Sequence, residues 1–227
     1  MNLTYPTFHI TFQRMTSKHE PQQDRALVLL REKGMARLSE LNAAGITAAT
    51  ISRMKERGLV LQLGRGLYQL PDASFDAHHA LAAAAKLVPK GVVCLTSALA
   101  YHELTDTISR GVWMAIGSKD RRPQIEQPRL VIVRFGPKVF STGIEHVIEG
   151  VTVRIFNPAK TVVDLFRYRP SVGKLYKKSP GLNLGLEGMR EALLQRKATP
   201  AEIARFAEEA GVWNAMRPYL EAMTANA

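Results

Sequence analysis

Apolar positions in the first third of the chain recur at helical spacing in three successive segments. We expect Asp24 to cap the first helix and Gly34 to end it, because short acidic side chains accept hydrogen bonds from free helix N–H groups and glycine favours helix ends. A second, shorter helix is predicted within residues 38–45. Thr47 then opens a third helix over residues 48–57.

Strand-like apolar runs replace the helical spacing after the third helix. They occupy residues 59–63 and 67–70, and the intervening turn, Gly64-Arg65-Gly66, predicts a β-hairpin. Three helices followed by a hairpin is the element order of a winged helix-turn-helix. We therefore predict that fold for residues 21–71.

Strands and then helices are predicted for the rest of the chain. An alanine-rich helix spans residues 77–87, and the chain is mainly helical after residue 158. The predicted strands between them are residues 92–95, 112–116, 130–135, 145–148 and 151–156. This order favours an α+β fold, with an N-terminal winged helix-turn-helix followed by a mixed α/β C-terminal domain. The predicted divisions are an N-terminal arm (residues 1–20), the winged helix-turn-helix (21–71) and the C-terminal domain (77–227).

The net charge of +11 indicates a polyanionic partner, because Lys and Arg release condensed counterions when they neutralise phosphates. Residues 1–70 hold ten Lys/Arg against five Asp/Glu, residues 71–156 ten against eight, and residues 157–227 eleven against seven. Basic charge also suits RNA, ribosomes or anionic lipids. The charge therefore restricts the class of partner without identifying it.

Targeting signals are not found in the sequence. The single cysteine, Cys94, leaves no internal disulfide framework. No apolar run approaches the roughly 18 residues of a membrane span, and the first residues lack the pattern of a secretory signal. We expect a soluble, cytoplasmic protein.

Catalytic motifs are equally lacking. Gly117-Ser118 suggests a nucleotidyltransferase, but the paired carboxylates that would hold Mg²⁺ do not follow it. The histidines and the cysteine match no zinc spacing, and His78 and His79 are interpreted as surface residues near a helix start. We expect no enzyme activity, no catalytic residue, no metal and no cofactor.

The third helix carries residue types that read a major groove. Those predicted to face inward are Ala48, Ile51, Met54 and Gly58, and those predicted to face outward are Ala49, Thr50, Arg53, Glu56 and Arg57. Small residues permit close approach to DNA, and Arg53 can reach a guanine edge. Thr47, Ser52 and Lys55 are expected to contact phosphates. An ordinary solvated helix face is the alternative.

Two further basic features extend the predicted DNA site. Arg65 lies at the hairpin tip between glycines that permit positive φ, and we expect it to enter a minor groove. An ordinary exposed turn is the alternative. Between Leu165 and Leu182 there are five basic residues and no acidic one. From this patch Lys174, Lys177 and Lys178 are predicted to contact the DNA backbone, with a toxin's acidic surface or solvent as alternatives.

A helix is predicted to begin at Asn157-Pro158, with Asn157 as its cap and Pro158 in its first position. Asp164 is expected to favour the positive end of this helix. The apolar face would comprise Val162, Val163, Leu165 and Phe166. This signature is therefore interpreted mainly as fold-defining.

Three segments together resemble the AbiEi-type antitoxins of type IV toxin–antitoxin systems. They are GLVLQLGRGLYQL (residues 58–70), CLTSALAYHEL (94–104) and NPAKTVVDLFRYR (157–169). The first resembles the wing of that family, the second its central helix and the third its C-terminal signature. The likeness covers roughly residues 22–222, and the linked order of the three segments is more specific than the wing alone.

The resemblance implies a transcriptional autorepressor that binds inverted repeats in double-stranded DNA and antagonises a nucleotidyltransferase toxin. It also implies that the C-terminal domain is needed for that antagonism. Alternatives are a solitary winged-helix regulator whose C-terminal domain senses a ligand or partner, and an RNA-binding module. The operator, the toxin and whether it is contacted, the oligomeric state and the role of the arm stay open.

Overall fold

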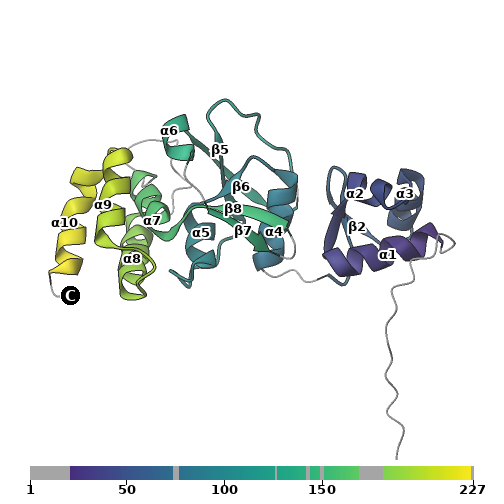
Figure 1. Ribbon diagram of the computed structural model, residues 1–227, viewed down its shortest axis with the longest axis horizontal. Coiled ribbons are helices and arrows are strands. Elements are labelled where there is room, and N and C mark those ends of the chain that lie inside the picture. The colour runs from purple at the N-terminus through teal and green to yellow at the C-terminus, as the bar shows by residue number, and fades with distance from the viewer. Residues whose placement is uncertain are drawn as a thin grey trace, which may run out of the picture.

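The computed structural model describes residues 21–73, 77–125, 127–141, 144–148, 151–168 and 181–225. The predicted N-terminal arm and the basic residues Lys174, Lys177 and Lys178 lie outside these ranges. Figure 1 shows an N-terminal unit, residues 21–73, beside a larger C-terminal unit that begins at residue 77. No helix in the described part of the chain is both long and apolar enough to cross a membrane.

The N-terminal unit contains the three predicted helices and the predicted hairpin. The helices are α1 (Gln22–Lys33), α2 (Leu38–Ala43) and α3 (Ala48–Glu56). The hairpin comprises β2 (Leu61–Gly64) and β3 (Leu67–Gln69). A short strand that the sequence analysis missed, β1 (Met35–Arg37), pairs antiparallel with β3 and gives the sheet order β1-β3-β2.

A compact apolar core joins the three helices of this unit. Its fully buried members include Leu30 of α1, Leu41 of α2, and Ile51 and Met54 of α3. The predicted capping role of Asp24 is wrong, because Pro21 is the N-cap of α1 and Asp24 lies within its first turn. The acidic side chain remains near the positive end of the helix, where it is favourable.

The C-terminal unit is built on a five-stranded mixed sheet. Its strands are β4 (Val92–Val93), β5 (Val112–Gly117), β6 (Leu130–Phe135), β7 (Ile144–Ile148) and β8 (Val151–Ile155). Their order is β6-β5-β4-β8-β7, with parallel β5–β6 and β4–β8 pairs and antiparallel β4–β5 and β7–β8 pairs. The described part of the chain is therefore a mixed α+β structure, as expected from the sequence.

The helices of the C-terminal unit pack on the sheet or on other helices. They are α4 (Ala77–Leu87), α5 (Leu95–Tyr101), α6 (Pro137–Phe140), α7 (Pro158–Arg167), α8 (Gly181–Leu194), α9 (Pro200–Glu209) and α10 (Trp213–Thr224). Of these, α8, α9 and α10 pack on α7 and on one another. Successive side chains of β4 point to opposite faces of the sheet, so the core has two clusters. Val92 belongs to the cluster with α5 and α7–α10, and Val93 belongs to the cluster with α4. Figure 1 shows α8, α9 and α10 at the end of the molecule farthest from the N-terminal unit.

Helix α7 begins as predicted but uses its aspartate differently. Asn157 accepts a hydrogen bond from the Lys160 backbone N–H at 2.8 Å, and Pro158 occupies the first helical position. Asp164 lies beyond the first turn, so the expected dipole interaction is wrong. Its Oδ2 instead accepts from Lys160 Nζ at 2.7 Å, and both side chains are almost completely buried.

The buried ammonium group of Lys160 contacts two aromatic rings as well as Asp164. Lys160 Nζ lies 4.3 Å from the ring centroid of Phe156 and 5.2 Å from that of Phe135. Burial raises the pKa of Asp164 to about 6, although the neighbouring Lys160 opposes that shift. Taking two charges out of water is costly, so the pair restricts which substitutions the core accepts.

We expect Asp164→Ala to lower the free energy of unfolding by about 3–5 kcal/mol, because it leaves Lys160 buried without its partner. Replacing both residues, as Lys160→Met with Asp164→Leu, removes the unpaired charge and should recover most of the loss. Urea unfolding of the single and double variants measures the difference. Equal losses in the two would show that the charge pair is not what constrains this helix.

Candidate nucleic-acid interface

A glutamine from α1 fixes the start of α3. Gln22 Oε1 accepts hydrogen bonds from the Thr47 N–H at 3.0 Å, from Thr47 Oγ1 at 3.0 Å and from Thr50 Oγ1 at 2.7 Å. Thr47 also caps α3, since its hydroxyl accepts from the Thr50 N–H. The sequence analysis missed Gln22, because nothing in the local pattern of α1 indicates a partner twenty-five residues away.

Thr50 does not lie on the outer face of α3, contrary to the sequence prediction. Only 8% of it is exposed, and its hydroxyl is engaged by Gln22. Ala48 and Gly58, expected to face inward, are exposed instead. The face is rotated because the short α3 packs Thr50, Ile51 and Met54 against the core.

The exposed stripe of α3 follows helical spacing and combines small and charged residues. Its members are Ala49, Ser52, Arg53 and Glu56. Arg53 Nε donates weakly to the Ala49 carbonyl at 3.4 Å, and Ser52 Oγ donates to Glu56 Oε1 at 3.4 Å. These are long, surface hydrogen bonds that a stronger partner can replace.

A lysine and a glutamine join α3 to the hairpin. Lys55 Nζ donates to Gln62 Oε1 at 2.7 Å, and Gln62 Nε2 donates to the Gly64 carbonyl at 3.2 Å. Arg65 follows Gly64 in the turn and is exposed. Side-chain hydrogen bonds therefore connect α3 to the hairpin turn.

The two glycines of the turn have different roles. Gly66 has a φ of +69°, so the turn requires the left-handed conformation there. Gly64 does not have positive φ, contrary to expectation, but a Cβ on it would lie 2.7 Å from Cδ2 of Leu87 in α4. The turn end of the hairpin is therefore set closely against the C-terminal unit.

Arg57 and Arg65 are the two basic side chains on or beside α3 and the hairpin turn that have no partner among the described residues. Neither makes a side-chain hydrogen bond or ion pair with any residue that the structure describes, and both are exposed. The structure thus brings Thr47, Ser52, Arg53, Lys55 and Arg57 together on or beside α3 and joins the Arg65 turn to it. It withdraws Thr50 into the core.

Side chains of α4 attach the N-terminal unit to the C-terminal unit. Lys86 Nζ donates to the Met35 carbonyl at 3.0 Å and to Glu40 Oε2 at 2.9 Å. His79 Nε2 lies 2.7 Å from Oε1 of the buried Gln69. The expectation that His79 is a surface residue is therefore wrong, because only 4% of it is exposed.

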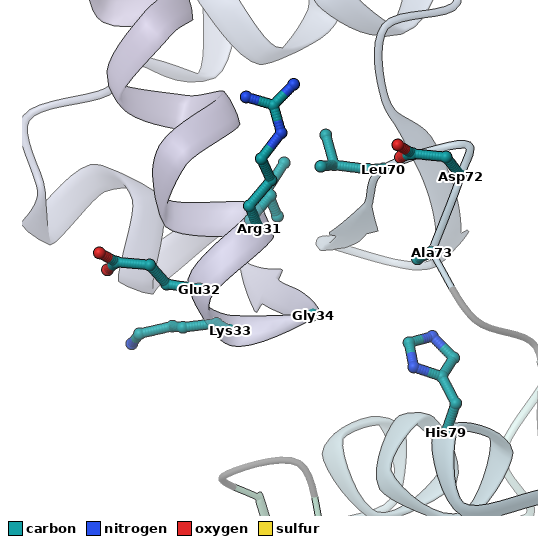
Figure 2. A pocket seen from close by; sticks show the side chains of 9 residues that line it. Arg31, Glu32, Lys33, Gly34, Leu70, Asp72, Ala73 and His79 are labelled. Atoms are coloured by element: carbon teal, nitrogen blue, oxygen red, sulfur yellow. The ribbon is translucent and has the colours of Figure 1, made fainter.

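A hollow of about 510 Å³ lies beside this attachment, between the end of α1, the end of the hairpin and α4. Figure 2 shows His79 projecting from α4 toward Ala73, with Gly34 and Leu70 on the N-terminal side. The charged side chains of its lining have both signs and belong to Arg31, Glu32, Lys33 and Asp72. The hollow is part of the junction and does not include the α3 stripe.

Glu40 is the most strongly perturbed acid of the N-terminal unit. Burial acts to raise its pKa, but hydrogen bonds from the Arg37 N–H, Lys86 and Lys33 outweigh burial and lower the pKa from 4.5 to about 2. A carboxyl with a depressed folded-state pKa stabilises the fold above its unfolded value, and that stabilisation disappears as the pH falls toward the folded value.

We therefore expect Glu40→Gln to lower the free energy of unfolding at neutral pH, and the difference from wild type to shrink as the pH falls from about 4.5 toward 2. Urea unfolding across this pH range measures it. Glu32→Gln, at an exposed acid on the neighbouring helix, is the matched control and should change little. A difference independent of pH would contradict the role of the Glu40 charge.

Comparison with known proteins agrees with the organisation of the N-terminal unit. Residues 25–71, which run from α1 to the end of the hairpin, match the family described as transcriptional regulator, AbiEi antitoxin. This match confirms over that segment the resemblance predicted from the sequence. A search of curated proteins finds no match to the chain.

The fold of the larger part of the chain has a structural relative. It is similar to the crystal structure of the RV2827C protein from Mycobacterium tuberculosis, with a TM-score of 0.56 and 13% sequence identity. The similarity covers 90% of this chain and 80% of that one. At this identity it shows a shared fold and carries no statement about function.

Proposed function

We propose that residues 25–71, which match the family described as transcriptional regulator, AbiEi antitoxin, form a winged helix-turn-helix that binds double-stranded DNA in a sequence-specific manner. The observation that carries the proposal is the exposed stripe of α3, in which Ala49 and Ser52 leave room beside Arg53. An α-helix with small residues and an arginine fits a major groove, where arginine pairs with the guanine edge.

Surrounding residues support a role in phosphate contact. Lys55 and Arg57 flank the stripe, and the hydroxyl of Thr47 lies at the N-terminus of α3, where the helix dipole favours anions. Arg65 extends the surface to the hairpin turn, from which it would enter the adjacent minor groove. We propose the same backbone-contacting role for Lys174, Lys177 and Lys178.

The regulatory role follows from this contact. The chain would act as an autorepressor on inverted repeats upstream of its own gene and as the antitoxin of a type IV toxin–antitoxin system. Its functional partner would be a nucleotidyltransferase toxin, and the C-terminal unit would be required for the antagonism. The protein would be a binding protein of the cytoplasm without enzyme activity.

A gel-shift titration on the DNA upstream of the gene tests the proposal directly, with a scrambled duplex and an RNA as competitors. We expect a salt-sensitive shift of the native duplex that neither competitor removes at equal concentration. Equal binding of all three nucleic acids would contradict sequence-specific DNA recognition. Preference for RNA would favour an RNA-binding module.

We expect Arg53→Ala to weaken operator binding by about 1–3 kcal/mol and to relax the preference at one base position, because the guanine contact is lost. Binding selection from a randomised operator measures both effects. Arg217→Ala removes an exposed arginine from α10 and is the matched control. An unchanged base preference in the Arg53 variant would remove α3 from the recognition surface.

Arg65→Ala should weaken the operator complex and reduce its salt dependence by about one counterion, since one groove-seeking charge is lost. The measurement is the slope of log affinity against log salt concentration for wild type and variant. Base preference at the α3 positions should stay as in wild type. Identical slopes would show that the hairpin turn does not contact DNA.

A further inference from the structure

A second hollow lies in the C-terminal unit, at the edge where β5 and β6 begin. Its volume is about 550 Å³, and it is lined by the start of α4, the end of α5, the loop over residues 105–111 and residues 127–129. It includes none of the α3 or hairpin residues discussed above. A concave site of this size suits a small organic molecule.

Arg110 and Arg129 lie on two backbone segments that contact each other closely at this edge. The Val112 N–H donates to the Arg129 carbonyl at 2.8 Å, and Ser109 Oγ donates to the Gly111 carbonyl at 2.6 Å. A Cβ on Gly111 would lie 2.6 Å from the Arg129 carbonyl oxygen, so only glycine permits this approach. Arg110 and Arg129 therefore start from neighbouring, fixed positions.

The charges of these arginines are not compensated within the described chain. Neither side chain makes a hydrogen bond or an ion pair with a residue that the structure describes. The one acidic residue of the lining, Asp106, is not ion-paired with either. Both side chains are exposed and belong to the lining, so a carboxylate held in the hollow would accept charge-assisted hydrogen bonds from them.

The remaining lining offers an aromatic wall and an apolar rim. The Tyr101 ring contacts the rings of His78 and His146 at centroid distances of 5.8 and 5.1 Å. Ile108 is 93% exposed and belongs to the lining, as does the buried Leu81. An apolar group bound in the hollow would cover the Ile108 side chain.

We propose that this hollow binds a small aromatic carboxylate. The ring lies against Tyr101 and Ile108, and the carboxylate lies between Arg110 and Arg129. The aromatic wall selects a planar ring, and the two guanidinium groups select its acid over a neutral counterpart.

Helix α4 connects this site to the N-terminal unit. His78 and Leu81 line the hollow, whereas His79, Lys86 and Leu87 of the same helix contact Gln69, Glu40 and Gly64. A ligand that shifts α4 would therefore shift the attachment of the DNA-binding unit. This consequence rests on the proposed function, whereas ligand binding itself does not.

Isothermal titration calorimetry of the full chain tests the site with benzoate, phenylacetate and indole-3-acetate, each against its amide: benzamide, phenylacetamide and indole-3-acetamide. We expect at least one carboxylate to bind and its amide not to. Arg110→Ala and Arg129→Ala should each weaken binding at least about tenfold, since each removes a charge-assisted contact. Arg121→Ala, at an exposed arginine outside the lining, should bind as wild type.

Absence of binding by all three carboxylates would overturn the proposal, as would equal binding of acids and amides or undiminished binding by both arginine variants. A second titration measures operator affinity with and without the bound carboxylate. We expect it to change for wild type and not for Arg129→Ala; an unchanged affinity in wild type overturns the coupling through α4. Failure of the proposed DNA-binding function would give a different result. The protein without ligand would then not bind the operator, while calorimetry would still detect binding of the carboxylate.

Discussion

The packing of α4 between two sheets is the constraint on which the arrangement of the molecule depends. Its alanines at positions 82 to 85 are buried, in one cluster with Met35 and Leu67 of the N-terminal sheet and with Val153 and Ile155 of the C-terminal sheet. Alanine side chains let a helix approach both layers closely, and larger residues there would force the layers apart. The alanine-rich composition thus determines how the two units meet.

Polar contacts fix the orientation that this packing permits. Lys86 reaches the Met35 carbonyl and Glu40, and His79 reaches Gln69. On the far side of the N-terminal unit, Gln22 ties the start of α3 to α1. The proposed reading helix is therefore held both by its own core and, through the sheet, by α4, so a contact made at α4 can influence how the helix is presented to DNA.

The sequence was sufficient for elements with strong periodicity or clear caps. The hairpin, α3 with Thr47 as its cap, α7 with Asn157 as its cap, and the four longer strands are found where the pattern predicted them. Strand β1 was missed because three residues carry no recognisable period and depend on β3 for their hydrogen bonds. Local pattern also determines the C-terminal helices, each of which has its own apolar face.

Long-range pairing was the information that the sequence lacked. Thr50 was placed outward by helical spacing alone, and its burial follows from Gln22 on another helix. His79 and Asp164 were assigned local roles, yet their partners are Gln69 across the junction and Lys160 in a buried core. Exposure was predicted correctly where it follows from the helical pattern, as for Ala49 and Arg53, and incorrectly for Thr50, where a distant polar residue competes.

Methylation protection of the DNA upstream of the gene tests the central claim most directly, because dimethyl sulfate modifies guanine N7 in the major groove. The account predicts that the full chain protects a small set of guanines in one major-groove segment, and that Arg53→Ala exposes one of them while the rest stay protected. Protection that is absent, or spread evenly along the duplex and unchanged in the variant, would contradict DNA reading by α3.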